Sequence, residues 1–176
     1  GRKVQFAAAY QPAMLFNGYA ASEVNSVLRT GAFSVEFWFN PISVNSVQLI
    51  AGREAAATGF RLFTPGGDGH IEFDGQPGES LNLVTSGWVA NSNQFIAATF
   101  DGSLATVYKN GVFAAAGAVD VGSMNNASSG SIFFGGRTSP YQGTIWGARY
   151  YASALSAPQV ADHFAGRFYD TTSDAL

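Results

Sequence analysis

Apolar side chains recur at every second position in the most regular part of this sequence, which is the period of a β-strand. From Phe33 to Asn40, phenylalanine and valine alternate with serine, glutamate, tryptophan and asparagine. This pattern predicts a strand with one apolar face, and Pro41 ends it because proline cannot donate a hydrogen bond to a ladder. A second run, Phe95 to Phe100, is apolar at almost every position and predicts an inner strand that is buried on both faces.

Two turn signals follow this second run. Asp101-Gly102 predicts a turn, and residues 104–108 then alternate as a strand does. Asn110-Gly111 predicts a hairpin with a type I′ turn, because both central residues of that turn need positive φ angles. Residues 112–116 are then expected to form the returning strand.

Shorter apolar runs between glycine, proline and asparagine clusters predict the remaining strands. They are 14–16, 47–51, 59–63, 70–73, 81–84, 131–135 and 143–151. Ser156, followed by Gln159 in the spacing of a capping box, predicts the start of a short helix that Gly166 is placed to end. About a dozen short strands with one late helix indicate a β-sandwich or a barrel.

The composition fits a chain that folds around a substantial core. The chain has 176 residues, of which 47% are hydrophobic and 14% aromatic, and no linker or change of composition divides it. We therefore expect one domain over residues 1–176, with its core from about 13 to 166. No apolar run approaches the roughly 20 residues that span a bilayer, so we expect no membrane insertion.

Charge and cysteine content narrow the range of partners. Only 12% of the residues are charged, about half the usual share, which suits a secreted protein or a subunit covered by neighbours. The net charge is -3 without a basic run, so we expect no nucleic-acid partner. The absence of cysteine excludes disulfides and Cys-ligated zinc. The chain begins with Gly1 and no signal peptide, so we expect a processed chain or an excised domain.

Four segments, in this order, resemble the laminin-G-like, concanavalin A-like lectin/glucanase jelly-roll family. They are the Leu-Phe-Asn-Gly of 15–18, the Phe-Ser-Val-Glu-Phe-Trp-Phe-Asn-Pro of 33–41, the hairpin 96–111 and the closing segment 134–160. The resemblance covers residues 14–164. It implies an all-β, two-sheet antiparallel β-sandwich (jelly roll, concanavalin A-like) with one short C-terminal helix, and it leaves the function open because the family is functionally broad.

Calcium is the one metal that the resemblance suggests, because some members bind it through acidic loop residues. In this chain Trp146-Gly147 stands where the family often has Asp-Glu, and the loop after residue 18 offers only Glu23. Calcium takes six to eight oxygen ligands, so we expect no cofactor and no metal site, with Ca²⁺ as the alternative. His70 and His163 are isolated from each other in sequence, and His163 is expected at the surface or half-packed on the helix.

Paired carboxylates are the strongest catalytic candidate. Glu72 and Asp74 are two positions apart, so both should project from one face of a strand, as the carboxylates of glycosidases on related jelly rolls do. Those enzymes carry a further glutamate where this chain has Gln76 and Pro77. We therefore interpret the segment as an exposed strand edge that enters a turn, and we expect no catalytic residues and no enzymatic activity.

Aromatic rings beside polar loops are the best candidates for ligand binding, because sugar faces stack on flat rings while amides bind the hydroxyls. The predicted ligand-binding residues are Trp88, Tyr141, Tyr19, Asn91 and Gln142, with Asn93 beside them. The alternative is that Trp88 covers a sheet edge and Tyr141 packs beneath the closing strand, because large aromatic residues are mostly buried.

We therefore expect a non-enzymatic recognition module, first of all a carbohydrate-binding, lectin-like one, on an extracellular or virion surface. Its expected partner is a glycan or a protein surface. The alternative is a structural, decoration or fibre component of a phage or viral surface assembly that contacts itself or neighbouring subunits. A glycan hydrolase is the third possibility. The weakly charged, cysteine-free composition is compatible with the first two.

Overall fold

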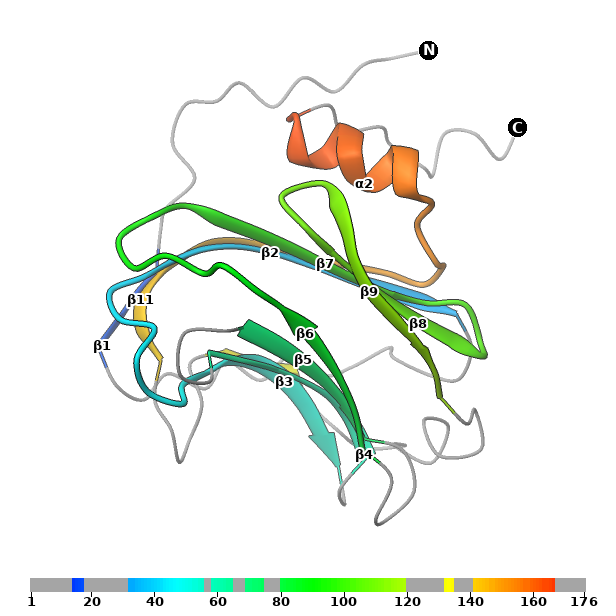
Figure 1. Ribbon diagram of the computed structural model, residues 1–176, viewed down its shortest axis with the longest axis horizontal. Coiled ribbons are helices and arrows are strands. Elements are labelled where there is room, and N and C mark those ends of the chain that lie inside the picture. Colours follow the sequence, from blue (N-terminus) through cyan, green and yellow to red (C-terminus); the bar gives the residue numbers. More distant parts are fainter. Residues whose placement is uncertain are drawn as a thin grey trace.

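The computed structural model describes residues 14–17, 32–55, 58–64, 69–74, 80–119, 132–134 and 141–166. In this part of the chain, two antiparallel sheets lie face to face and one helix covers the outer face of one of them (Figure 1). The predicted two-sheet antiparallel sandwich with one short C-terminal helix is therefore confirmed.

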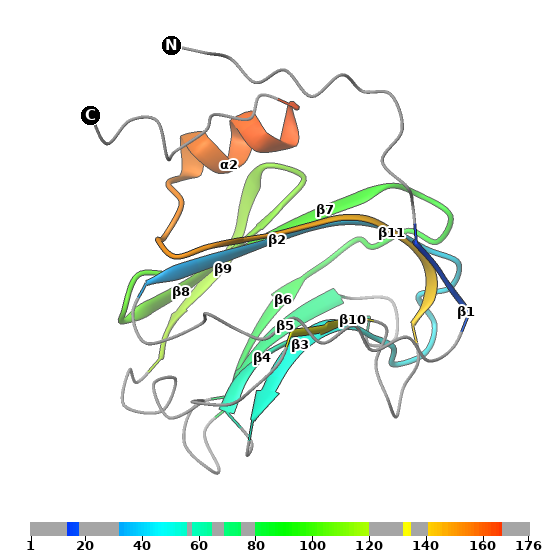
Figure 2. The same cartoon turned by 180° about the vertical axis from the view of Figure 1, so that it is seen from behind.

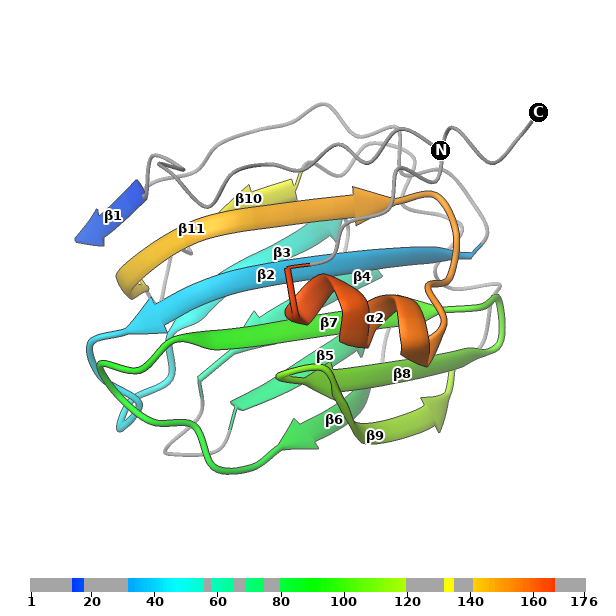
Figure 3. The same ribbon diagram turned by 90° about the horizontal axis from the view of Figure 1, so that it is seen from above.

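Each sheet has a spatial order of strands that differs from their order in the sequence. Sheet A contains six described strands, which lie side by side in the order β1 (Met14–Asn17), β11 (Gln142–Tyr151), β2 (Phe33–Pro41), β7 (Gln94–Phe100), β8 (Leu104–Lys109) and β9 (Val112–Ala118). Sheet B contains five, in the order β10 (Ile132–Phe134), β3 (Leu49–Ala55), β4 (Thr58–Phe63), β5 (Gly69–Asp74) and β6 (Ser80–Thr85). The helix, α2 (Ala157–Phe164), lies on the outer face of sheet A (Figure 3).

Both sheets curve in the same direction. Figures 1 and 2 show sheet A arching over sheet B, with the outer face of sheet B on the inside of the curve. The core lies between the sheets. Its fully or almost fully buried members include Val35, Phe37, Phe39, Ile50, Leu62, Ile71, Leu83, Ile96, Ala98, Phe100, Val107 and Ile145.

The alternation predicted for β2 is confirmed. Val35, Phe37 and Phe39 point into the core between the sheets. Trp38 lies on the opposite face, where it packs against the cluster beneath α2. The apolar set therefore faces sheet B and the mixed set faces the helix, as a strand with one apolar face requires.

The prediction that residues 95–100 form an inner strand is also confirmed. β7 pairs with β2 on one side and with β8 on the other, and every one of its residues is buried. Sheet B covers one face of β7, while Leu155 and Val160 pack against Phe95 and Ala97 on the other. The strand is apolar on both faces because both are covered.

The predicted hairpin turn has the required geometry. Asn110 and Gly111 have φ angles of 50° and 78°, both positive. The Asn110 side-chain oxygen also accepts a hydrogen bond from the Phe95 amide at 3.0 Å, which ties the turn to β7. In the preceding turn, Asp101 Oδ1 accepts the amides of Leu104 and Ser103 at 2.8 Å each, and these bonds lower the pKa of the Asp101 carboxyl.

The helix begins and ends as its sequence predicts. Gln159 Oε1 accepts the Ser156 amide at 2.9 Å, and Gly166, with a φ angle of 75°, donates its amide to the His163 carbonyl oxygen. His163 itself corrects the prediction, because it is 1% exposed instead of lying at the surface or half-packed. Its imidazole points from α2 toward sheet A, where Nδ1 lies 2.8 Å from Glu36 Oε1.

Candidate functional site

Four of the five predicted ligand-binding residues lie at one end of the sandwich, around Pro41, where β2 ends. Tyr19 lies outside the described residues. Trp88 and Tyr141 are buried there, while Asn91 and Gln142 are exposed. The two kinds of predicted residue thus form an inner and an outer layer of the same end.

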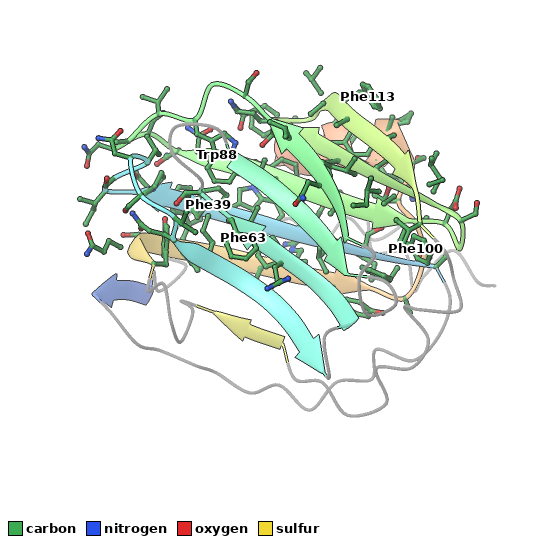
Figure 4. The ribbon with its side chains drawn as sticks, turned by 60° about the horizontal axis from the view of Figure 1, so that its bottom comes forward. Phe39, Phe63, Trp88, Phe100 and Phe113 are labelled. Atoms are coloured by element: carbon green, nitrogen blue, oxygen red, sulfur yellow. The ribbon has the colours of Figure 1, made fainter. Side chains whose placement is uncertain are left out.

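Trp88 belongs to the inner layer. Its side chain is 5% exposed, and its ring centroid lies 5.0 Å from that of Phe39 (Figure 4). Its indole Nε1 donates a hydrogen bond to Thr85 Oγ1 at 2.6 Å. The ring therefore offers no open face to a sugar. Trp88 has the packing role that was the alternative expectation from the sequence.

Tyr141 is the second buried ring. It is fully buried and meets Phe39 edge-on at 6.3 Å between ring centroids. Burial raises the pKa of the Tyr141 hydroxyl far above its usual range, so the ring stays neutral. Gly143 crosses beside it with a φ angle of 154°, and a Cβ there would collide with the Asn40 carbonyl oxygen and the Tyr141 hydroxyl. Tyr141 therefore also has a packing role.

The outer layer consists of side-chain amides, which we call the amide cluster (Asn40, Asn91, Asn93 and Gln142). The backbone N–H of Asn91 donates to the backbone carbonyl oxygen of Pro41 at 2.6 Å, and the backbone N–H of Ile42 donates to the backbone carbonyl oxygen of Gln142 at 2.9 Å. Asn40 Nδ2 donates to Asn93 Oδ1 at 3.0 Å. These bonds bring three separate parts of the sequence together around the end of β2.

A buried glutamine that sequence reasoning missed supports this cluster. Gln48 is 3% exposed, and its Oε1 accepts a hydrogen bond from the backbone N–H of Gln142 at 2.8 Å. Its Nε2 donates to the Ser43 carbonyl oxygen at 3.2 Å. The loop between β2 and β3 is thereby fixed to the start of β11. The available signal in the sequence was a single polar residue, Gln48, next to an apolar run. Such a signal does not reveal that its partner is Gln142, which is 94 residues away.

Hydrogen bonds hold the loop between β6 and β7 at residues 86 and 87 and, through the Asn91 backbone N–H, at residue 91. Lys109 Nζ donates to the carbonyl oxygens of Ser86 and Gly87 at 2.5 and 2.7 Å, before Trp88. Asn91 has a φ angle of 56°, a conformation that asparagine tolerates better than most residues. The loop therefore presents its amides from a defined backbone.

Exposed aliphatic side chains accompany the amide cluster. Ile42, Val47 and Val89 are 54%, 54% and 56% exposed and belong to the same two loops. Residues 41–48 and 86–93 contain no charged side chain. Among the described residues, these two loops therefore present uncharged amide and aliphatic side chains, with the Lys109 ammonium bound at residues 86 and 87.

The outer face of sheet B is a second surface with a ring. The Arg61 guanidinium lies 5.4 Å from the centroid of the partly exposed Phe63 ring (Figure 4). In strand register, Arg61 lies opposite Glu72, and Glu72 lies opposite the exposed Asn82. This face lies on the inside of the curve of the sandwich.

The segment 70–74 lies inside this sheet. β5 pairs with β4 on one side and β6 on the other, so the expectation of a strand edge is corrected. The physical reason is that flanking turns look alike before an inner strand and before an edge strand.

Within the described residues, no three His, Cys, Asp or Glu side chains come together as a metal-binding group. No helix in the described ranges is long and apolar enough to cross a membrane.

Solved structures with this fold were found at low sequence identity. Domain 4 of AbnA, a GH43 extracellular arabinanase from Geobacillus stearothermophilus in complex with arabinotriose, has a TM-score of 0.72 at 21% identity, over 85% of this chain and 75% of that one. The receptor binding domain of botulinum neurotoxin D has a TM-score of 0.71 at 17% identity, over 86% of this chain and 43% of that one. A heptameric SAP-like pentraxin from Limulus polyphemus has a TM-score of 0.63 at 12% identity, over 85% and 79%.

These likenesses show the fold alone. The chain spans less than half the length of the neurotoxin receptor binding domain. Among curated proteins no match was found. The sequence model of the Laminin_G_3 family, described as the concanavalin A-like lectin/glucanases superfamily, matches residues 16–161. This protein therefore belongs to the concanavalin A-like lectin/glucanases superfamily.

Proposed function

We propose that this protein is a non-enzymatic recognition module of a secreted or particle-surface protein, and that it binds a carbohydrate at the amide cluster. The observation that carries the proposal is the pair of loops at the end of β2, whose uncharged side chains include both exposed amides and exposed aliphatic groups. In this proposal, Asn91 and Gln142 contact the ligand, as the sequence predicts, while the buried Trp88 and Tyr141 support the loops from below.

The chemistry of the surface fits a sugar. A side-chain amide has a donor and an acceptor, as a sugar hydroxyl does, so the two groups can form paired hydrogen bonds. Ile42 and Val89 offer apolar area to the C–H face of a sugar ring. Because the loops 41–48 and 86–93 carry no charge, we expect a neutral oligosaccharide as the ligand.

The frame beneath the surface lowers the cost of binding. Gln48 fixes one loop and Lys109 fixes the other, so few backbone bonds need to be ordered when a ligand binds. The structural likeness to an arabinanase domain in complex with arabinotriose supports a carbohydrate ligand by analogy.

The experiment is a glycan array, followed by titration calorimetry with the best neutral oligosaccharide and with arabinotriose. Two exposed amides of the cluster, Asn93 and Gln142, are replaced in the variants Asn93→Ala and Gln142→Ala. Asn82→Ala is the matched control, because Asn82 is an exposed asparagine on the outer face of sheet B. We expect each cluster variant to weaken binding by about tenfold, the effect of about 1.4 kcal/mol, with an unchanged melting temperature.

Three outcomes would contradict this proposal. An array without a bound glycan would remove the ligand. Loss of binding in Asn82→Ala alone would place the ligand on the outer face of sheet B. Hydrolysis of the oligosaccharide that disappears in Glu72→Gln would favour a glycan hydrolase.

A structural role in a phage or viral surface assembly is the second candidate. The observation that favours it is the exposed apolar group of Val112, Phe113 and Phe164, which are 68%, 61% and 46% exposed. Figure 4 shows Phe113 on the edge strand β9. The test is sedimentation velocity over a range of concentrations. Self-association that Phe113→Ser abolishes would support this role, while a strictly monomeric protein without a partner in its native particle would contradict it.

A further inference from the structure

An acid–base pair is buried between α2 and sheet A. Glu36 on β2 is 0% exposed and His163 on α2 is 1% exposed. The distance from His163 Nδ1 to Glu36 Oε1 is 2.8 Å. The Tyr151 hydroxyl on β11 donates to Glu36 Oε2 at 3.0 Å, and its ring stacks on the imidazole. A single carboxylate thus holds two donors from two elements.

The hydrogen bonds define the protons of this group. An ionised carboxylate can only accept, so the imidazole carries a hydrogen on Nδ1. Burial raises the pKa of the Tyr151 hydroxyl to about 12, although the Arg149 hydrogen bond lowers it, so Tyr151 remains a neutral donor in acid. The protons that could change this arrangement in acid are therefore one that binds the second nitrogen of the His163 imidazole, which makes it an imidazolium, and one that binds the Glu36 carboxylate.

In the part of the chain that the structure describes, the titratable groups that face the pair come from β11, α2 and β8. From β11, Arg149 lies opposite Glu36 in strand register, with its guanidinium 5.5 Å from the centroid of the Trp38 ring. On α2, the half-buried Asp162 precedes His163. From β7, the residue opposite Glu36 is the uncharged Ala97. Tyr108, from β8, packs beneath the same helix.

Apolar packing and hydroxyl hydrogen bonds also attach the helix. Leu155 and Val160 pack against Phe95, Ala97 and Tyr108. The linker before α2 is held by Ser34, whose Oγ donates to the Ser153 carbonyl oxygen at 2.9 Å and accepts the Leu155 amide at 2.8 Å. A helix as short as α2 is not stable in water without such contacts. The Glu36–His163 pair is the buried polar contact of α2 in which both side chains can take up a proton in acid.

We propose that the Glu36–His163 pair is an acid-sensitive latch: protonation of the Glu36 carboxylate leaves the buried imidazolium without a counterion, and α2 lifts from sheet A while the sandwich stays folded. A buried charge that loses its partner is strongly unfavourable, and a protonated carboxyl can no longer accept from both donors. The Ser34 hydrogen bonds retain the linker, which acts as the hinge. Opening uncovers Phe95, Ala97 and Tyr108 as an apolar surface.

The test uses the absence of cysteine from the chain, since one introduced thiol is then the only one. Val160→Cys places it beneath α2, and Val107→Cys places it between the sheets. Both valines are 0% exposed, so the pair is matched in residue type and burial. The labelling rate with dithiodipyridine is measured at several pH values and divided by the rate of the same variant unfolded in urea.

Between about pH 7 and about pH 4, the relative rate at position 160 should rise at least tenfold, while that at position 107 should rise less than about twofold. His163→Asn, which keeps a neutral donor, should reduce the rise at position 160 to less than about twofold. Glu36→Gln should open the helix at a higher pH than in the unmodified chain, because a protonated imidazole would then have no carboxylate beside it.

Equal rises at positions 160 and 107 would mean global unfolding and would overturn the proposal. So would a rate at position 160 that does not depend on pH, or an acid response that persists in His163→Asn. Should a variant fail to fold, hydrogen exchange of the 157–164 amides in the unmodified chain, corrected for intrinsic rates, gives the same answer. Protection that falls in acid only for α2 supports the latch, and protection that falls throughout the chain overturns it.

Discussion

Removal of the Trp88 indole is expected to destabilise the sandwich strongly, because this ring belongs to the core and packs against Phe39 near the end of β2. Trp88 is 5% exposed, so nearly all of the roughly 250 Å² of a tryptophan side chain is buried. At about 25 cal/mol per Å², this burial is worth about 6 kcal/mol at most, and a compact unfolded chain lowers the figure. We therefore expect Trp88→Ala to lower the free energy of unfolding by about 3–5 kcal/mol.

The hydrogen bond of Trp88 can be separated from its packing. Nε1 donates to Thr85 Oγ1 at 2.6 Å, and Thr85 is 1% exposed. Trp88→Phe keeps an aromatic ring and removes the donor, while Thr85→Val removes the acceptor and leaves a buried N–H. Each should cost about 1–3 kcal/mol, and the double variant should cost about 1 kcal/mol less than the sum.

The assay is urea unfolding followed by far-ultraviolet circular dichroism, a signal that does not depend on the replaced indole. Titration of the same variants with the oligosaccharide from the glycan array shows whether Trp88 supports the binding loops or contacts the ligand itself. A Trp88→Ala protein that loses less than about 1 kcal/mol of stability but no longer binds the glycan would refute the packing argument. Trp88 would then contact the ligand itself.

Two further predictions concern β11 and the buried tyrosines. Gly143→Ala should lower the free energy of unfolding, measured by urea unfolding, by about 2 kcal/mol or more beyond the effect of Gly166→Ala. A Cβ at 143 would meet the Asn40 carbonyl oxygen and the Tyr141 hydroxyl, whereas a Cβ at 166 would have open space around it. Equal effects would contradict this contact. The unfolded chain loses tyrosine protons near pH 10, but the pKa of Tyr151 is raised to about 12, mainly by burial, and burial raises that of Tyr141 further. The free energy of unfolding should therefore fall as the pH rises from about 10 to 12, and an absorbance titration should show tyrosines that ionise only as the fold is lost. Ionisation of all tyrosines near pH 10 in a folded chain would exclude this.

Local signals in the sequence were sufficient for most of the elements. The alternation in β2 predicts its two faces, since a strand has a period of two whatever surrounds it. Asn110-Gly111 predicts its turn because few residues accept positive φ angles. Boundaries are less local: the strand predicted at 47–51 runs from Leu49 to Ala55, because pairing with β4 extends it through polar residues.

The candidate site was predicted only in part. The sequence drew attention to Asn91 and Gln142, and folding brings both to the end of β2. Whether Trp88 and Tyr141 face solvent or core depends on Phe39, which fills the space between the two sheets at that end. A residue next to a loop can point either way, and local sequence does not distinguish the two.

The sequence by itself thus determined the strands, their turns, the helix ends and the jelly-roll family, because each depends on backbone preferences within a few residues or on segments that follow one another in order. Tertiary structure alone decided which polar groups meet. Gln48 reaches Gln142 over 94 residues, and Glu36 reaches His163 over 127. A glutamate on a strand and a histidine on a helix each look like surface residues in isolation. They are buried because each satisfies the other, and only the docking of α2 on sheet A brings them within hydrogen-bond distance.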